Sequence, residues 1–113
     1  MNIKRGGVYV ASLDPALGRE ISKTPVVIVS NDKNNEFSGT VTILPLTSQN
    51  LERIYPFEVL LPKGMGNLPK DSKVKVDQIR TLDKARIVKY VGDLGKAEMK
   101  GIDAAVKIHL GLT

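Results

Sequence analysis

The chain has 113 residues, with 17 lysines and arginines, 12 aspartates and glutamates, one histidine and no cysteine. A length near ~100–150 residues is typical of one domain, so we expect a single domain over residues 1–113. The lack of cysteine excludes disulfides, cysteine metal sites and thiol nucleophiles. No apolar run approaches the ~20 residues of a membrane span, and residues 1–7 lack the apolar region of a signal peptide. These features predict a soluble, cytoplasmic domain.

The net charge of +5 is concentrated in one part of the chain, which we call the basic stretch (residues 63–89). Eight basic residues stand there against three aspartates, an excess equal to the charge of the whole chain. Such a stretch can follow the phosphate backbone of a nucleic acid. A solvated strand face whose lysines block edge pairing is an equally good interpretation of the same composition.

Short β-like segments make up most of the chain. Runs of branched and aromatic residues predict strands at 7–13, 25–30, 40–46, 57–61, 72–79 and 86–91. Proline has no amide to donate, so we expect Pro25 only at the start of its strand and Pro45 at an edge or bulge. The polar cluster at 31–35 predicts a turn.

A helix is predicted to begin at Asp93 or Gly95 and to end near Leu110, because apolar residues recur there at spacings of three and four. Gly101 inside this helix would cost up to ~1 kcal/mol relative to alanine. We therefore expect close packing at Gly101, against the rest of the chain or another chain. Several short strands followed by one helix predict a mainly β fold with a C-terminal helix, either a small SH3-like barrel or an OB-fold.

The residue types present restrict the available chemistry. The acidic residues lack the spacing of a Ca²⁺ or Mg²⁺ loop, nucleotide-binding glycine motifs are absent, and His109 near the helix end is expected to have a structural role. An enzyme built from this chain would use Arg, Lys, Thr, Ser or backbone groups, with no cofactor and no metal. RNA cleavage suits these groups, because the attacking 2′-hydroxyl belongs to the substrate and the protein orients it and stabilises charge on the phosphorane.

Four segments in order resemble the MazF/PemK family of toxin endoribonucleases from type II toxin–antitoxin systems. They are Lys-Arg-Gly-Gly-Val-Tyr at 4–9 with Leu-Asp-Pro at 13–15, Pro-Val-Val-Ile-Val-Ser-Asn-Asp at 25–32, Pro-Leu-Thr-Ser at 45–48 and Gln-Ile-Arg-Thr-Leu-Asp-Lys at 78–84. The resemblance implies an SH3-like barrel of the CcdB/MazF type and a homodimer. It also implies a metal-independent, sequence-specific endoribonuclease that cuts single-stranded RNA to 2′,3′-cyclic phosphate and 5′-hydroxyl ends. A cognate MazE-like antitoxin, whose disordered tail occupies the RNA groove, is implied as well.

The resemblance assigns roles to three residues of the matching segments. Thr47 matches the family's catalytic threonine, whose hydroxyl can hydrogen-bond a phosphate oxygen; the alternative is a threonine that caps a turn. Gln78 and Arg80 lie in the matching Gln-Ile-Arg segment and are expected to contact RNA. Gln can read a base edge, and Arg can pair with a phosphate or stack on a base. A structural role for Arg80, paired with Asp83 or bracing a dimer, is the alternative.

The chain departs from the family pattern at the position before Pro25. The resemblance implies that the principal catalytic arginine stands there, whereas this chain has Thr24, and its loop is one residue shorter than the pattern. Threonine cannot supply the charged fork that arginine offers to a phosphate, so we expect weak cleavage or none. Lys23 and Thr24 are expected to contact RNA, and Lys23, Arg19 or Arg53 could substitute for the arginine.

Two other classes of function are open at this point. One is a non-enzymatic RNA-binding barrel of the SH3-like or OB type, and the other is a CcdB-like toxin that inhibits DNA gyrase. RNA-binding barrels usually stack bases on exposed aromatic rings, and three tyrosines with two phenylalanines are few for that purpose. Assays of RNA cleavage and of DNA gyrase inhibition would distinguish the two toxin classes.

Overall fold

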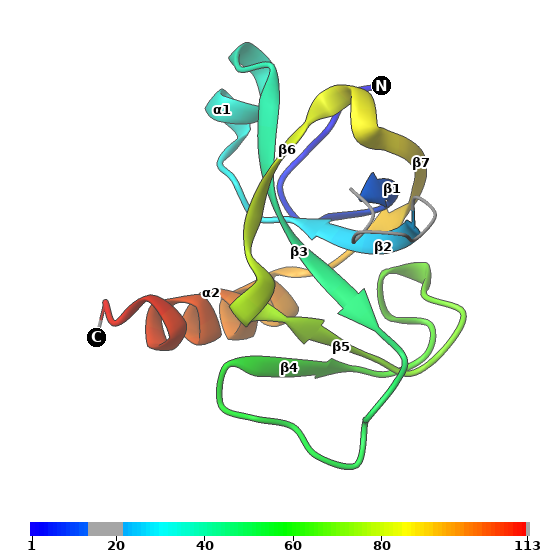
Figure 1. Cartoon of the computed structure of the whole chain (residues 1–113), viewed down its shortest axis with the longest axis vertical. Coiled ribbons are helices and arrows are strands. Elements are labelled where there is room, and N and C mark those ends of the chain that lie inside the picture. The colour runs from blue at the N-terminus through cyan, green and yellow to red at the C-terminus, as the bar shows by residue number, and fades with distance from the viewer. Residues whose placement is uncertain (14–21, 113) are drawn as a thin grey trace.

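A computed structural model describes residues 1–13 and 22–112 (Figure 1). The strands are β1 (Gly7–Leu13), β2 (Ser22–Ile28), β3 (Thr40–Thr47), β4 (Glu58–Leu61), β5 (Ser72–Lys75), β6 (Arg80–Asp83) and β7 (Ile87–Asp93). The α-helices are α1 (Asp32–Phe37) and α2 (Lys96–Leu110), and the short 3-10 helices are η1 (Met65–Asn67), η2 (Val76–Gln78) and η3 (Lys84–Arg86). No helix of the described ranges is long and apolar enough to cross a membrane.

The strands form one antiparallel sheet in the order β4–β5–β3–β2–β1–β7, with β6 paired to β3. The long strand β3 organises this sheet. One of its edges pairs with β2, and the other pairs first with β6 through residues 40–43 and then with β5 through Leu46 and Thr47. The predicted mainly β fold with a C-terminal helix is confirmed, and the curved sheet gives it a small barrel-like shape (Figure 1).

Two prolines lie inside strands at points where the ladder is incomplete. Pro25 pairs with Val10 of β1, but β2 pairs with β3 only from Val26 onward. The prediction that Pro25 stands at the start of its strand is therefore wrong, because a strand with one open edge does not need every amide. Pro45 lies where β3 changes partner from β6 to β5, in keeping with the expected edge or bulge.

Successive residues of the central strands enter two apolar clusters. Val27 and Leu44 belong to a cluster that packs under α2 with Ile102. Their neighbours Val26 and Ile43 belong to a second cluster with residues of β1, β6 and β7. This alternation follows from the two-residue period of a strand, and it confirms that both faces of β2 are covered.

Three local features differ from the prediction. Residues 31–35, predicted as a turn, begin α1, because Asn31 Oδ1 accepts a hydrogen bond from the Asn34 amide at 2.9 Å and caps the helix. The strand predicted at 72–79 is interrupted by η2. Gly101 faces open space within this chain, so it does not pack closely against the rest of the chain, and packing against another chain stays a prediction. Close backbone packing occurs instead at Gly92 of β7, where a Cβ would lie 2.5 Å from the carbonyl oxygen of Gly66 in η1.

Arg5 joins three parts of the fold near the N-terminus. Its amide donates to Asp32 Oδ1 of α1 at 2.7 Å. Its guanidinium forms an ion pair with Asp103 of α2 and donates to the carbonyl oxygen of Val29, which follows β2. The segments at 4–9 and 25–32 therefore meet at one point, where their polar residues stabilise the fold.

Candidate functional site

Thr47 is the last residue of β3, where the chain leaves the sheet. It pairs with Lys73 of β5, and its side chain is half-buried. Thr47 Oγ1 accepts a hydrogen bond from the Gln49 amide at 3.1 Å, which is the turn-capping contact expected for a threonine without a catalytic role. That contact uses an oxygen lone pair and leaves the hydroxyl proton free to donate. The cap is thus compatible with a hydrogen bond from Thr47 to a phosphate oxygen.

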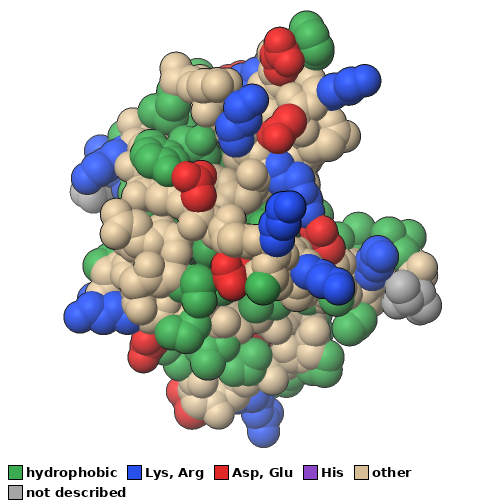
Figure 2. Space-filling model, turned by 180° about the vertical axis from the view of Figure 1, so that it is seen from behind, with side chains coloured by type: hydrophobic (Ala, Val, Ile, Leu, Met, Phe, Trp, Pro, Cys, Tyr) green, Lys and Arg blue, Asp and Glu red, His purple; other side chains and the backbone are tan. Residues whose placement is uncertain are grey.

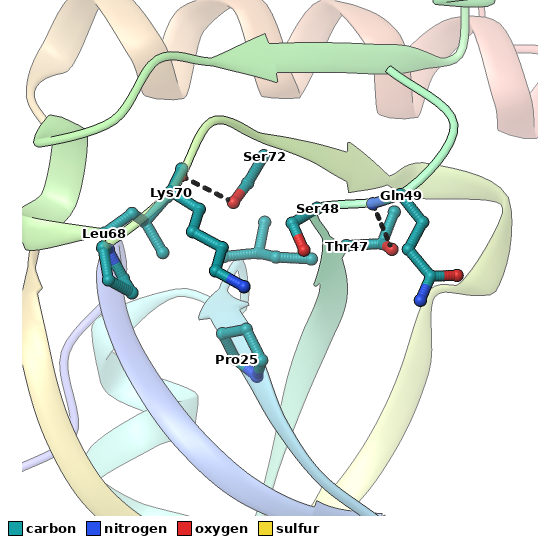
Figure 3. A pocket seen from close by; sticks show the side chains of 9 residues that line it. Pro25, Thr47, Ser48, Gln49, Leu68, Lys70 and Ser72 are labelled. Atoms are coloured by element: carbon teal, nitrogen blue, oxygen red, sulfur yellow. Dashed lines mark hydrogen bonds between the residues drawn. The ribbon is translucent and has the colours of Figure 1, made fainter.

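A hollow of about 220 Å³ opens beside Thr47 (Figure 3). Pro25 and Leu68 stand on its apolar side, and the Lys70 side chain extends into it. Ser72 Oγ donates to the carbonyl oxygen of Lys70 at 3.0 Å, which holds the backbone that carries the lysine. The hollow therefore combines an apolar surface with a cation next to a hydroxyl group.

A second hollow, of about 500 Å³, adjoins the first, and Leu46, Thr47 and Gln49 line both. Thr24 of β2 and Gln78 at the end of η2 also line this second hollow. We call the two hollows together the Thr47 groove. Hydroxyl and amide side chains from three separate elements converge in it, so it can donate and accept hydrogen bonds along a polar substrate.

The structure brings together three of the five residues predicted to form the site. Thr24, Thr47 and Gln78 share the second hollow, whereas Lys23 and Arg80 line neither hollow of the Thr47 groove. Lys23 is exposed, and it points away from the face that carries Thr24 because successive side chains of a strand face opposite ways. Arg80 is half-buried at the start of β6, where it pairs with β3.

Of the two other arginines that could substitute for the family's arginine, the structure describes Arg53. Arg19 lies outside the described residues. Arg53 is exposed, and its Nη1 donates to the Tyr55 hydroxyl at 3.2 Å. Arg53 lines a third hollow that shares Asn50 and Lys75 with the Thr47 groove, so it stands next to the groove without lining it.

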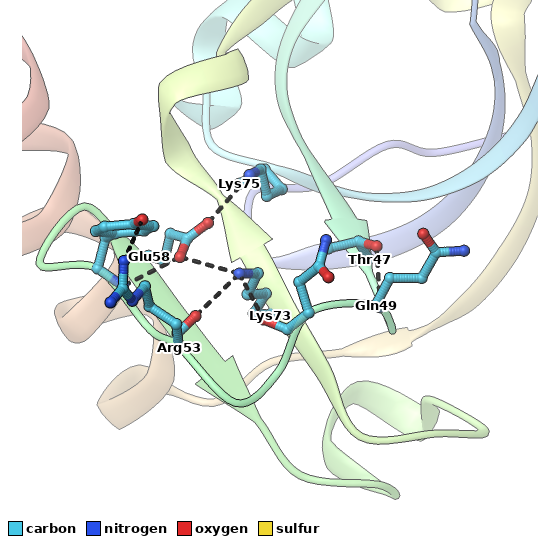
Figure 4. Close-up of polar contacts among 8 residues, drawn as sticks. Thr47, Gln49, Arg53, Glu58, Lys73 and Lys75 are labelled. Carbon is cyan, nitrogen blue, oxygen red and sulfur yellow. Dashed lines mark hydrogen bonds and ion pairs between the residues drawn. The ribbon is translucent and has the colours of Figure 1, made fainter.

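A buried cluster of one carboxylate and two lysines lies beside the Thr47 groove (Figure 4). The side chain of Glu58 is fully buried, and that of Lys73 is 4% exposed. Lys73 Nζ lies 3.1 Å from Glu58 Oε1, and Lys75 Nζ lies 3.1 Å from Glu58 Oε2. Lys73 and Lys75 also line the second hollow. With two ammonium groups and one carboxylate, the cluster has an excess positive charge beside the groove.

Glu58 is ionised despite its burial. Burial disfavours the charged carboxylate, but the hydrogen bond from the Tyr55 amide, at 3.0 Å, and the contacts of Lys75 and Lys73 outweigh this effect and lower the pKa of Glu58. The Glu58 carboxylate therefore stays charged at neutral pH.

The basic stretch does not form one continuous surface. Lys73 is buried and Lys75 is paired with Glu58, and Figure 2 shows lysines and arginines interspersed with aspartates and glutamates over one face of the molecule. The members of the stretch that line the Thr47 groove are Lys70, Lys73 and Lys75. Any contribution of this charge to the groove is thus local.

The single histidine lies outside the groove. His109 is exposed in the last turn of α2, and its ring centroid lies 6.4 Å from that of Phe57. Among residues 1–13 and 22–112, no group of three or more His, Asp or Glu side chains is placed to hold a metal ion.

Several groove residues are not predicted from the sequence. Gln49 and Asn50 directly follow the Pro-Leu-Thr-Ser segment, so their closeness to Thr47 in the chain is a usable signal. Lys70 and Lys73 come from the loop before β5 and from β5 itself, and only the pairing of β5 with β3 brings them to Thr47. Lysines alternating with valines predict an exposed face, and nothing local indicates that Glu58 will cover it.

Comparisons with known proteins agree with the fold and with the motifs. The family described as PemK-like, MazF-like toxin of type II toxin-antitoxin system matches residues 4–110. Endoribonuclease MazF9 of Mycobacterium tuberculosis (strain ATCC 25618 / H37Rv) is 37% identical over 116 residues, which cover 97% of this chain and 98% of that protein.

Two solved structures are similar along their whole length. An endoribonuclease from Mycobacterial species, in complex with its cognate antitoxin, superposes with a TM-score of 0.79 at 31% identity, covering 98% of this chain and 97% of that one. A MazE–MazF structure from Deinococcus radiodurans superposes with a TM-score of 0.82, covering 100% and 99% of the two chains. Its 23% identity supports the fold alone.

Proposed function

Because the chain belongs to the PemK-like, MazF-like toxin family of type II toxin–antitoxin systems, we propose that its Thr47 groove binds single-stranded RNA. The chain is a MazF-like toxin endoribonuclease, as its relative MazF9 is named. The observation that supports the assignment of the groove is the meeting of Thr24, Thr47 and Gln78 in one hollow. Thr47 and Gln78 belong to two of the four segments that resemble the family, and Thr24 directly precedes a third.

The proposed reaction is metal-independent transfer within the RNA. The 2′-oxygen attacks the adjacent phosphorus and loses its proton, the bond from phosphorus to the 5′-oxygen breaks, and that oxygen gains a proton. The products are a 2′,3′-cyclic phosphate and a 5′-hydroxyl. The Thr47 hydroxyl donates a hydrogen bond to a non-bridging phosphate oxygen, and Gln78 hydrogen-bonds a base edge. Lys70 and Lys75 supply positive charge along the groove.

The position of Thr24 in the groove limits the rate of RNA cleavage. Thr24 stands directly before Pro25 and lines the hollow that Thr47 lines, so the position of the family's arginine faces the groove. With threonine there, no guanidinium from this position meets the phosphorane charge. By analogy with removal of one oxyanion donor, we expect cleavage to be slower by ~10²–10³-fold than with the arginine. Thr24 also favours a second candidate function, RNA binding without cleavage.

The experiment compares this chain with Thr24→Arg and Thr24→Lys on a long single-stranded RNA in EDTA. The substitution keeps the pairing of β2 with β1, whereas an inserted arginine would turn every residue before it to the opposite face. We expect Thr24→Arg to gain cleavage with cyclic phosphate ends, Thr24→Lys to gain less because it lacks the planar fork, and Thr47→Ala to abolish the gain. No gain with Thr24→Arg would reject the assigned groove. Strong cleavage by the unchanged chain would reject its impairment.

The proposal includes the assembly that the family implies. We propose a single toxin domain over residues 1–113 that forms a homodimer in the cytoplasm and is held by a MazE-like antitoxin. The relative solved with its cognate antitoxin supports this partner class. An antitoxin that occupies the groove should compete with RNA, and light scattering should give twice the chain mass. Inhibition of DNA gyrase without RNA binding would favour the CcdB-like alternative.

A further inference from the structure

The segment between β3 and β4 (residues 48–57), which we call the groove loop, forms one wall of the Thr47 groove. Its first residues, Gln49 and Asn50, line the second hollow, and Arg53 and Tyr55 line the hollow next to it. The groove loop has no strand partner, and its own hydrogen bonds are those of short turns, such as the bond from the Glu58 amide to the carbonyl oxygen of Tyr55 at 2.8 Å. These turns do not join the loop to the sheet, so its placement against β5 depends on contacts from elsewhere in the fold.

Lys73 provides those contacts. Its ammonium donates to the carbonyl oxygen of Asn50 at 2.9 Å, to that of Arg53 at 3.1 Å and to Glu58 Oε1 at 3.1 Å (Figure 4). An ammonium has three protons, so this set of acceptors uses all of them. Glu58 Oε1 also accepts the Tyr55 amide at 3.0 Å. The groove loop is thus tied at three residues to one buried ion pair.

We propose that Lys73 is a positioning residue for RNA, which fixes the groove loop against β5 and so sets the wall that faces the substrate beside Thr47. This role rests on the proposed function of the groove. Lys73 itself does not bind a phosphate, because its side chain is 4% exposed and its protons are committed. Lys75, two residues along the same strand face, is 25% exposed and lines the groove, so it can meet a phosphate directly.

Stability alone does not account for this cluster. Replacing a buried ion pair by apolar residues of similar volume is often neutral or stabilising, so apolar residues at 58 and 73 could hold β4 to β5. They could not donate to the carbonyl oxygens of Asn50 and Arg53, which the sheet leaves without partners. An ammonium group at position 73 is therefore needed to hold the groove loop in place.

The experiment uses the full chain and three variants: Lys73→Met, the double variant Glu58→Leu with Lys73→Met, and Lys75→Met as a matched control. The RNA probe is a labelled single-stranded pool of random sequence with 2′-O-methyl groups, which removes the attacking hydroxyl. Affinity is measured over a range of salt concentrations. Thermal unfolding and hydrogen exchange of the groove loop are measured without RNA.

We expect the double variant to unfold at a higher temperature than Lys73→Met, which leaves Glu58 buried without this partner, while its groove-loop amides exchange faster than those of the parent. Its RNA affinity should fall by about tenfold or more, as for the loss of charged hydrogen bonds, with an unchanged salt slope. Lys75→Met should lower the salt slope by about 0.7, the loss of one phosphate contact on a single strand, and leave exchange unchanged.

Three results would overturn the proposal: unchanged affinity in a folded double variant, a lower salt slope in Lys73→Met, or failure of both Lys73 variants to fold. The last would make the ion pair a requirement for folding. An absence of RNA binding by the parent chain would instead reject the proposed function. Hydrogen exchange needs no RNA, so it would still show whether Lys73 holds the groove loop.

Discussion

The two ends of β3 are held by different kinds of interaction. Around residues 40–46 the strand is packed by apolar side chains, and Val41, Ile43 and Leu44 are completely buried. At Thr47 it pairs with Lys73 of β5, and the Lys73 side chain forms a buried ion pair with Glu58 of β4. Apolar packing depends on volume and is insensitive to pH, whereas an ion pair depends on both partners and on their charge. The first region builds the sheet, and the second holds the end of β3 that lines the Thr47 groove.

The largest expected effect tests the charged region. Glu58→Ala should lower the free energy of unfolding by about 3–5 kcal/mol, because two lysines lose their counterion. Chemical denaturation measures it, and Glu36→Ala, at an exposed carboxylate of α1, is the control expected to have no effect. Equal losses for Glu58→Ala and Glu36→Ala would contradict the role given to the buried ion pairs of Glu58.

A similar but pH-independent effect is expected in the apolar region. Ile43→Ala leaves a cavity at a completely buried position and should lower the free energy of unfolding by about 2–5 kcal/mol. The loss, measured by urea unfolding, should be the same at pH 7 and pH 4 because no charge is involved. A loss that changes with pH would mean that the two regions are coupled.

The smallest effect is the pH dependence of the charged region. The pKa of Glu58 is lowered by folding, so the unfolded chain binds more protons and stability rises with pH. This contribution is complete above the ordinary carboxyl pKa of ~4.3 and is lost as the pH falls through the lower folded value. Glu58→Gln should flatten the profile of unfolding free energy between neutral and acid pH. A residual slope is expected from Asp32, whose pKa is lowered mainly by the Arg5 amide.

Much of the fold follows from local pattern. The strands at 7–13 and 40–46 and the C-terminal helix are predicted because their apolar periodicity agrees with what the sheet and α2 bury. The turn predicted at 31–35 fails because asparagine favours both turns and helix caps, and the contact of Asn31 with Asn34 decides for a cap. Pro25 is misplaced because the open edge of β2 is a property of the whole sheet.

The candidate site is predicted less completely than the fold. Thr47, Thr24 and Gln78 are found through motifs, and the structure places them in one hollow. Lys73 is predicted as part of an exposed basic stretch, yet it is buried, with its ammonium against Glu58 and the groove loop. That difference arises from cross-strand pairing between β4 and β5, which no spacing within either segment reveals.

The contact of Gly92 with Gly66 has a consequence for how the groove can diversify. At Gly92 the backbone of β7 lies directly against that of Gly66 in η1, and no side chain from position 92 or 66 separates them. The groove wall that follows η1, at Leu68 and Pro69, therefore has a fixed backing. Among relatives that keep this contact, a change in the shape of the groove next to Gly66 has to come from the wall residues themselves.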